Sequence, residues 1–210
     1  MQTISHFLMT GAVNHQLRKT TVPVHSKALL IGSVLPDIPF ALLTIAGEIY
    51  YRWFAVPPTG QSIMEYLHFD LFFTNPLWVV SHNFFHSLVI NTVLIILGYI
   101  GIRSQQSKNR GTRPVLRQAQ EPPVEGWSLA LFWLAIGTQF HTIIDVLTHH
   151  SDGPLLFFPL NWTYRFPSPI SYWETAYYSR PFIAFEYLLD ALIIGFFVYL
   201  WRQRRAKSRQ

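Results

Sequence analysis

The sequence predicts an all-α, multi-pass transmembrane helical bundle of about four spans. Half of its 210 residues are hydrophobic and only 13% are charged, whereas about 25% of residues are charged in soluble domains. Four apolar stretches approach the roughly 20 residues that a helix needs to cross a bilayer. The basic residues gather in short runs between these stretches, which is typical of membrane-surface loops and not of a nucleic-acid interface.

The predicted spans cover residues 28–49, 84–102, 127–147 and 182–201. Pro36 and Pro39 fall inside the first of them, and proline breaks or kinks a helix. This stretch therefore either crosses the membrane or only dips into it. The number of crossings depends on which of the two occurs.

The distribution of Lys and Arg predicts the orientation, because cytoplasmic loops accumulate these residues. With the N-terminus inside, most of the 16 basic residues fall on the cytoplasmic side, and only Arg52, Arg165 and Arg180 fall outside. We therefore expect a multi-pass cell-membrane protein with both termini in the cytoplasm.

Two segments rich in aromatic residues and proline, 50–83 and 148–181, connect the spans on the outer side. Trp and Tyr favour the membrane–water interface, so we expect these segments to lie there and to cover a site between the helices. On the inner side, the polar residues 104–126 predict a flexible linker. The whole chain, residues 1–210, is otherwise expected to be one membrane-embedded domain.

Histidine and aspartate recur at four-residue spacing in two places. His82 and His86 open the second predicted span, and His141, Asp145 and His149 follow one another in the third. Residues four apart share one face of a helix, so each series presents potential metal ligands in one direction. Because the chain has no cysteine, nitrogen and oxygen would have to hold the metal. Two imidazoles and a carboxylate suit zinc in a hydrolytic site, with manganese or iron as alternatives.

Further carboxylates lie at a similar depth in the membrane. At 1.5 Å per residue, the ligand candidates of the second to fourth spans lie within about 12 Å of the outer helix ends; these are His86, His141, Asp145, Glu186 and Asp190. Asp37, between two prolines, lies deeper. An unpaired carboxylate there costs about 2.5–3.5 kcal/mol on insertion scales. A bound metal would offset that cost.

A structural role is the alternative for each of these residues. A single histidine in an apolar helix is more often packed and hydrogen-bonded than bound to a metal, so four histidines stay outside the expected site: His15, His25, His68 and His150. Hydrogen bonds between helices are the alternative for the two spaced series. Ion pairs with Arg165 or Arg180 are the alternative for Glu186 and Asp190.

Taken in order, these blocks resemble the YdjM-like family of predicted membrane-bound, metal-dependent hydrolases. Members show an early His, a Gly-x-Leu-Leu-Pro-Asp block, a His-Ser pair that opens a span, and a later His-x-x-x-Asp followed by Thr, Gly and Pro. The matching residues here are His6, Asp37, His86-Ser87, and His141 to Asp145 with Thr148, Gly153 and Pro159. The resemblance adds His6 to the expected ligands.

His6 conflicts with the expected orientation, because an inside N-terminus leaves it across the membrane from the other ligands. Either the first helix re-enters the membrane or His6 is not a ligand. The chain also departs from the family pattern at Pro39, where a second Asp is expected, which leaves the number of metal ions open. The order of the motifs is more distantly similar to zinc-dependent phospholipases C, which implies a phosphoester substrate.

These observations predict a membrane-bound, metal-dependent hydrolase that cleaves an ester or phosphoester of a lipid or membrane-associated substrate. The expected metal ligands are His6, Asp37, His82, His86, His141, Asp145 and His149. Asp145 and Glu186 are the expected catalytic carboxylates, with Glu186 orienting or deprotonating the attacking water. The expected partners are membrane lipids and a lipid-like substrate.

Two other classes of protein fit the same residues. One is a metal or proton transporter, and the other is a non-catalytic scaffold in which a metal staples the helices together. The inner halves of the spans, such as residues 90–102 and 193–201, are apolar. They leave no continuing polar path, which argues against transport.

Overall fold

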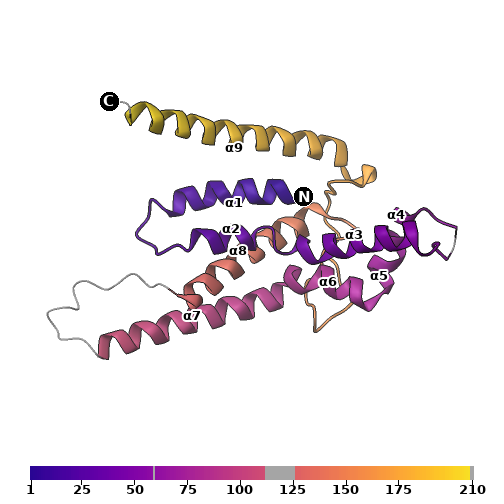
Figure 1. Cartoon of the computed structure of the whole chain (residues 1–210), viewed down its shortest axis with the longest axis horizontal. Helices are drawn as coiled ribbons and strands as arrows, with labels where there is room; N and C mark the ends of the chain where they lie inside the picture. The colour runs from indigo at the N-terminus through magenta and orange to yellow at the C-terminus, as the bar shows by residue number, and fades with distance from the viewer. Residues whose placement is uncertain (59, 112–125, 209–210) are drawn as a thin grey trace.

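The computed structural model describes residues 1–58, 60–111 and 126–208, and these form an all-helical bundle (Figure 1). In chain order the elements are α1 (Thr3–Leu17), α2 (Ser26–Gly32), α3 (Asp37–Trp53), α4 (Ile63–Glu65), the π-helix η1 (Tyr66–Leu71), α5 (Phe72–Thr74), α6 (Pro76–His86), α7 (Leu88–Gly111), α8 (Trp127–Thr148), the 3-10 helix η3 (Thr175–Tyr177) and α9 (Ser179–Lys207).

Three helices are long and apolar enough to cross a membrane: α7 over Leu88–Lys108, α8 over Trp127–Thr148 and α9 over Ser179–Lys207. The pair α2 and α3, bent by 47°, is a fourth candidate. This confirms the predicted class of a helical membrane protein with about four spans. Of the most apolar window of each long helix, 44% is buried in α8, against 11% in α7 and 6% in α9, so α8 is the central helix.

The first predicted span is broken in two, as its prolines suggested. Pro36 precedes α3 and Pro39 falls in its first turn, where a missing N–H costs no helical hydrogen bond. The break after Gly32 leaves carbonyl groups near the end of α2 without helical partners. One of them, from Ser33, later orients a histidine of the site.

The second predicted span also differs from the expectation, because the chain breaks at Ser87. Ser87 is extended, with φ −78° and ψ 123°, and its Oγ accepts a hydrogen bond from Ile90 N (3.1 Å). Ser87 therefore caps the start of α7. His82 and His86 lie on the separate helix α6, before the span and not within it.

Helix α1 is the element that the hydropathy pattern did not predict. It lies between α9 and α2 (Figure 1) and runs in the same direction as α9, because Gln2 contacts Glu186, Ser5 contacts Asp190 and Gly11 faces Phe197. The N-terminal end of α1 therefore lies at the opposite end of this helix pair from the basic end of α9.

Glycines set the close packing of α8 against its neighbours. A β-carbon on Gly137 would collide with the Leu29 carbonyl of α2, and one on Gly98 would collide with the Phe132 backbone. These approaches bring α2 and α7 onto α8. Helix α7 continues to Gly111, so the first part of the predicted linker 104–126 is helical, and residues 112–125 lie outside the described residues.

Candidate metal centre

Four side chains from three parts of the chain converge beside α8: Asp37, His86, His141 and Asp145. One ligand atom from each lies within 4.8 Å of the others. His141 Nε2 is 2.9 Å from Asp145 Oδ2, and His86 Nε2 is 3.2 Å from the same oxygen. Asp37 Oδ1 lies 3.4 Å from His141 Nε2 and 3.5 Å from His86 Nε2. We call these residues the four-residue cluster.

Backbone carbonyls determine which nitrogen of each imidazole faces the cluster. His141 Nδ1 lies 2.7 Å from Ser33 O, and His86 Nδ1 lies 2.6 Å from His82 O. A carbonyl oxygen only accepts, so both Nδ1 atoms carry the proton and the Nε2 atoms direct their electron pairs inward. Such oriented imidazoles are the usual arrangement at a metal site.

The cluster needs a positive charge at its centre. The two Nε2 atoms lie 3.1 Å apart, and two carboxylate oxygens lie beside them. If both imidazoles were neutral with their protons on Nδ1, the electron pairs of these four atoms would repel one another. Either protons or a metal ion must compensate. The donor set of two nitrogens and two carboxylates suits a borderline divalent ion, so the cluster can hold a metal ion.

Asp145 is engaged on both of its oxygens. Oδ2 faces His86 and His141, while Oδ1 lies 2.9 Å from His6 Nε2, 3.0 Å from the Met1 amino group and 3.6 Å from His149 Nε2. The carboxylate is 6% exposed. Asp145 therefore joins two sets of histidines, one on each side of its carboxylate.

His6 reaches this site because α1 runs inside the bundle. Its ring is buried and stacks on His141, with centroids 3.7 Å apart. The conflict noted from the sequence is resolved, because the N-terminal end of α1 and the metal ligands lie at the same end of the helices. Hydropathy alone could not place α1, since its apolar residues are interrupted by polar ones that face inward.

His149 is oriented by a residue that the sequence analysis missed. Its Nδ1 lies 3.1 Å from Asp152 Oδ1. Burial lowers the pKa of His149, but the carboxylates of Asp145 and Asp152 outweigh burial and raise that pKa above its ordinary value. The three-residue spacing between His149 and Asp152 is the signal that could have found this pair. Thr3, whose hydroxyl donates to Asp37 Oδ2 (2.5 Å), had no such signal.

The structure does not place His82 in the four-residue cluster. Its ring stacks on His86, with centroids 4.5 Å apart, and its Nδ1 is buried with no hydrogen-bond partner among the described residues. Burial, with help from His86 and Arg165, holds the pKa of His82 well below its ordinary value. His82 is thus a neutral neighbour of the cluster.

Glu186 and Asp190 contact α1, and not the arginines considered from the sequence. Glu186 Oε1 accepts a hydrogen bond from Gln2 N (2.7 Å), and Asp190 Oδ2 accepts one from Ser5 Oγ (2.8 Å). Glu186 is fully buried, and its Oε2 has no partner among the described residues. Glu186 therefore lies next to the first turn of α1, the turn that carries His6.

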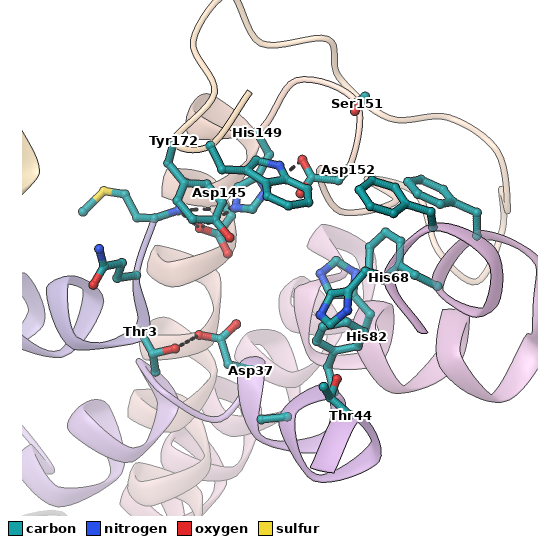
Figure 2. A pocket seen from close by; sticks show the side chains of 18 of the residues that line it. Thr3, Asp37, Thr44, His68, His82, Asp145, His149, Ser151, Asp152 and Tyr172 are labelled. Atoms are coloured by element: carbon teal, nitrogen blue, oxygen red, sulfur yellow. Dashed lines mark hydrogen bonds and ion pairs between the residues drawn. The ribbon is translucent and has the colours of Figure 1, made fainter. Parts of the chain in front are cut away.

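A pocket of about 790 Å³ opens from the metal centre (Figure 2). Asp37, Asp145, His82 and His149 are among its lining residues, together with several aromatic side chains: Phe40, Phe69, Phe72, Phe73, Tyr172 and Trp173. The Asp37 side chain is 28% exposed. The cluster is therefore open on this side.

The segment that follows α8 covers the pocket. The Tyr172 ring lies 4.7 Å from His149, and Trp173 stacks on Phe69 of η1 at 5.9 Å. Arg165 lies over the rings of Phe72 and Phe73, both at 5.3 Å, and donates to the Gly153 carbonyl. Burial, partly offset by Asp152, lowers the pKa of Arg165 to about 10. The segment after α8 is therefore in contact with α5 through Arg165.

The histidines set aside in the sequence analysis lie apart from the cluster. His25 caps α2 by accepting a hydrogen bond from Ala28 N (3.2 Å), and His150 Nδ1 contacts the Ser168 carbonyl (2.7 Å). His68 lines the pocket on its far side from Asp145 (Figure 2). His15 packs edge-on against Phe196.

The sequence profile of the YdjM inner membrane protein family matches residues 1–206. The chain belongs to the YdjM family of inner membrane proteins. The match includes α1 and α9 as well as the four-residue cluster, so His6 and Glu186 fall inside the family region of this YdjM-family chain. No curated protein and no solved structure matches the chain.

Proposed function

We propose that this YdjM-family protein is a membrane-bound, metal-dependent hydrolase that cleaves an ester or phosphoester of a lipid or lipid-like molecule. The observation that carries the proposal is the opening of the four-residue cluster onto an aromatic pocket. The cluster supplies a place for a metal, and the pocket supplies a place for an apolar substrate next to it.

Zinc is the first candidate for the metal, with manganese and iron as alternatives. Asp37, His86, His141 and Asp145 would hold it, because imidazole nitrogens and carboxylate oxygens are zinc ligands. Two imidazoles and one carboxylate are a donor set of catalytic zinc sites, in which a further position is left for water. When bound, such an ion activates water as a nucleophile and polarises the scissile group.

The protein side chains supply orientation and proton transfer. The carbonyls of Ser33 and His82 orient the two imidazoles, and the carboxylate of Asp152 orients His149 toward Asp145. His149 lines the pocket, so its imidazole is placed to exchange a proton with a bound substrate. A direct catalytic role for Glu186 stays a prediction, and its free Oε2 is the atom that would act.

The pocket favours an amphipathic substrate. Its volume falls within the range of about 300–1,000 Å³ of small-molecule sites, which are lined mainly by apolar side chains with a few polar groups. Here the lining combines the carboxylates and imidazoles of the metal centre with aromatic rings. A lipid headgroup would meet Asp37 and His149, while its chain would lie against Phe40 and Phe72.

A scaffold with a purely structural metal is less well supported. A structural site is closed by its protein ligands, whereas Asp37 lines a pocket and is partly exposed. We also propose that the basic end of α9 faces the cytoplasm, since Lys and Arg accumulate there. This orientation replaces the expected pair of cytoplasmic termini, because Met1 lies at the other end of the helix pair.

The proposal is tested on detergent-purified protein by elemental analysis together with hydrolysis assays on a phospholipid and phosphoester panel. The wild type should carry a divalent metal and release product, and His141→Ala should lose both. His25→Asn is the matched control, because Asn can still cap α2. A wild type that hydrolyses nothing when fully loaded with zinc, manganese or iron would refute the enzymatic role.

A further inference from the structure

The inward face of α1 is polar along its whole length. His6, Thr10 and Asn14 follow at four-residue spacing, so they lie on one side of the helix, and their exposed fractions are 0%, 1% and 9%. This face begins at the metal centre, where His6 contacts Asp145. It ends near His15, which packs against Phe196 of α9.

Buried polar atoms without a hydrogen-bond partner are concentrated on α1 and on the two helices that it contacts, α8 and α9. Among the described residues, all such side-chain atoms except those of Thr44 and His82 belong to α1, α8 or α9. They are His6 Nδ1, Thr10 Oγ1, Asn14 Oδ1, His15 Nε2, Gln139 Oε1, Glu186 Oε2 and Asp190 Oδ1. Figure 1 shows α1 lying along α9. Glu186 and Asp190 of α9 contact Gln2 and Ser5 at the start of α1, next to His6, which contacts Asp145 of α8.

Such atoms need hydration. Buried polar groups in folded proteins are almost always hydrogen-bonded, to protein or to ordered water, and the requirement is stricter at membrane depth, where bulk water is absent. One isolated exception would be unremarkable, but a continuous row of acceptors from His6 to Asn14 is what a chain of internal waters requires.

We propose that the polar face of α1 is a water path that reaches the metal centre from the end of the bundle opposite the pocket. Its role rests on the proposed hydrolysis: a substrate that fills the aromatic pocket blocks that side, so water must reach His6 and Asp145 by another way. The hydration itself does not depend on hydrolysis. The sequence predicted no polar path, because the inner halves of the four predicted spans are apolar. Helix α1 was not one of those spans.

The far end of the path favours water over ions. Arg18, Lys19 and Arg204 are close enough to His15 to lower its pKa, after the larger effect of its desolvation. Fixed positive charges at the mouth of a pore repel cations and protons but not water. The path is therefore expected to hydrate the site without carrying metal ions across the membrane.

The first test is water-edited solid-state NMR on the isotope-labelled protein in liposomes, which measures magnetisation transfer from water to each side chain. Thr10 and Asn14 should receive it, whereas Val13, which is 41% exposed on the outer face of the same helix, should not. Transfer to Thr10 and Asn14 no greater than to Val13 would overturn the proposal.

A variant pair then separates the path from the hydrolase. Thr10→Val with Asn14→Leu removes both acceptors, and the water signal of His6 should fall to the part that the pocket supplies through Asp145, while the metal content stays at the wild-type level. Thr44→Val is the control for the water signal, because it removes an unpartnered hydroxyl that lines the pocket and lies on α3, away from α1. If the His6 water signal in the double variant equals that of the wild type, the path is wrong even where hydrolysis is observed; if that signal falls but no substrate is ever cleaved, only the hydrolase is wrong.

Discussion

His86 Nε2 and His141 Nε2 lie 3.1 Å apart, and each ring donates its Nδ1 proton to a backbone carbonyl. The arrangement turns two electron pairs toward each other beside two carboxylates. A site of this kind needs either protons on the Nε2 atoms or a bound cation.

Asp145→Asn is expected to abolish metal binding. The amide keeps the shape of the side chain but removes the charge that both sets of histidines face. Loss of a residue that merely supports a ligand costs about 10–100-fold in metal affinity, and loss of the ligand itself costs more. Competition with a chromophoric chelator measures the affinity. Wild-type affinity in this variant would show that the metal, if any, binds elsewhere.

Asp152→Asn should separate orientation from metal binding. The variant weakens the contact that orients His149 but leaves the four-residue cluster intact, so we expect about a 10–100-fold loss of activity, as for other supporting carboxylates. Metal content should not change. Equal activity of the two proteins would remove His149 from the proposed proton transfer.

Metal removal should destabilise the protein in a pH-dependent way. Chelation removes a ligand that binds only the folded protein, so the melting temperature should fall and recover when zinc is added back. Protons compete with the metal for the Nε2 atoms, so metal occupancy should decrease as the pH is lowered. Differential scanning fluorimetry in detergent, from pH 8 to pH 5, measures both effects. A melting temperature indifferent to chelator at every pH argues against a bound metal.

Gly137→Leu should destabilise the bundle, because its side chain would meet the Leu29 carbonyl and Gly32. Overpacking of this kind costs about 1–3 kcal/mol or more. Gly195→Leu is the matched control, since no atom lies within 4 Å of a β-carbon at Gly195. Thermal unfolding of the two variants in the same detergent makes the comparison. Equal melting temperatures would show that α2 does not pack against α8 as described.

Phe72→Ala is expected to affect substrates according to their chain length. Phe72 lines the pocket beyond the metal centre, so its loss should raise the KM for long-chain lipid esters and leave short-chain, water-soluble esters unchanged. Steady-state kinetics on a chain-length series measures this difference. A uniform change in kcat across the series would instead point to a disturbed metal centre.

The sequence by itself determined the fold class, three of the long helices and most of the potential ligands. Hydropathy is a property of contiguous residues, so α7, α8 and α9 could be recognised without any tertiary contact. The four-residue spacing of His141 and Asp145 is also local, because one turn of α8 fixes the common direction of their side chains. His149 lies just after α8, with extended backbone, so its contact with Asp145 does not follow from that periodicity.

Only the tertiary structure decided which candidates meet. His6 joins Asp145 because α1 packs inside the bundle against α9, Asp37 meets His86 because the chain breaks at Ser33 and at Ser87, and His82 lies behind His86 on α6. These outcomes depend on how separate helices pack and on backbone carbonyls left free at helix ends. Neither can be deduced from the periodicity of one segment, because the partners lie far apart along the chain.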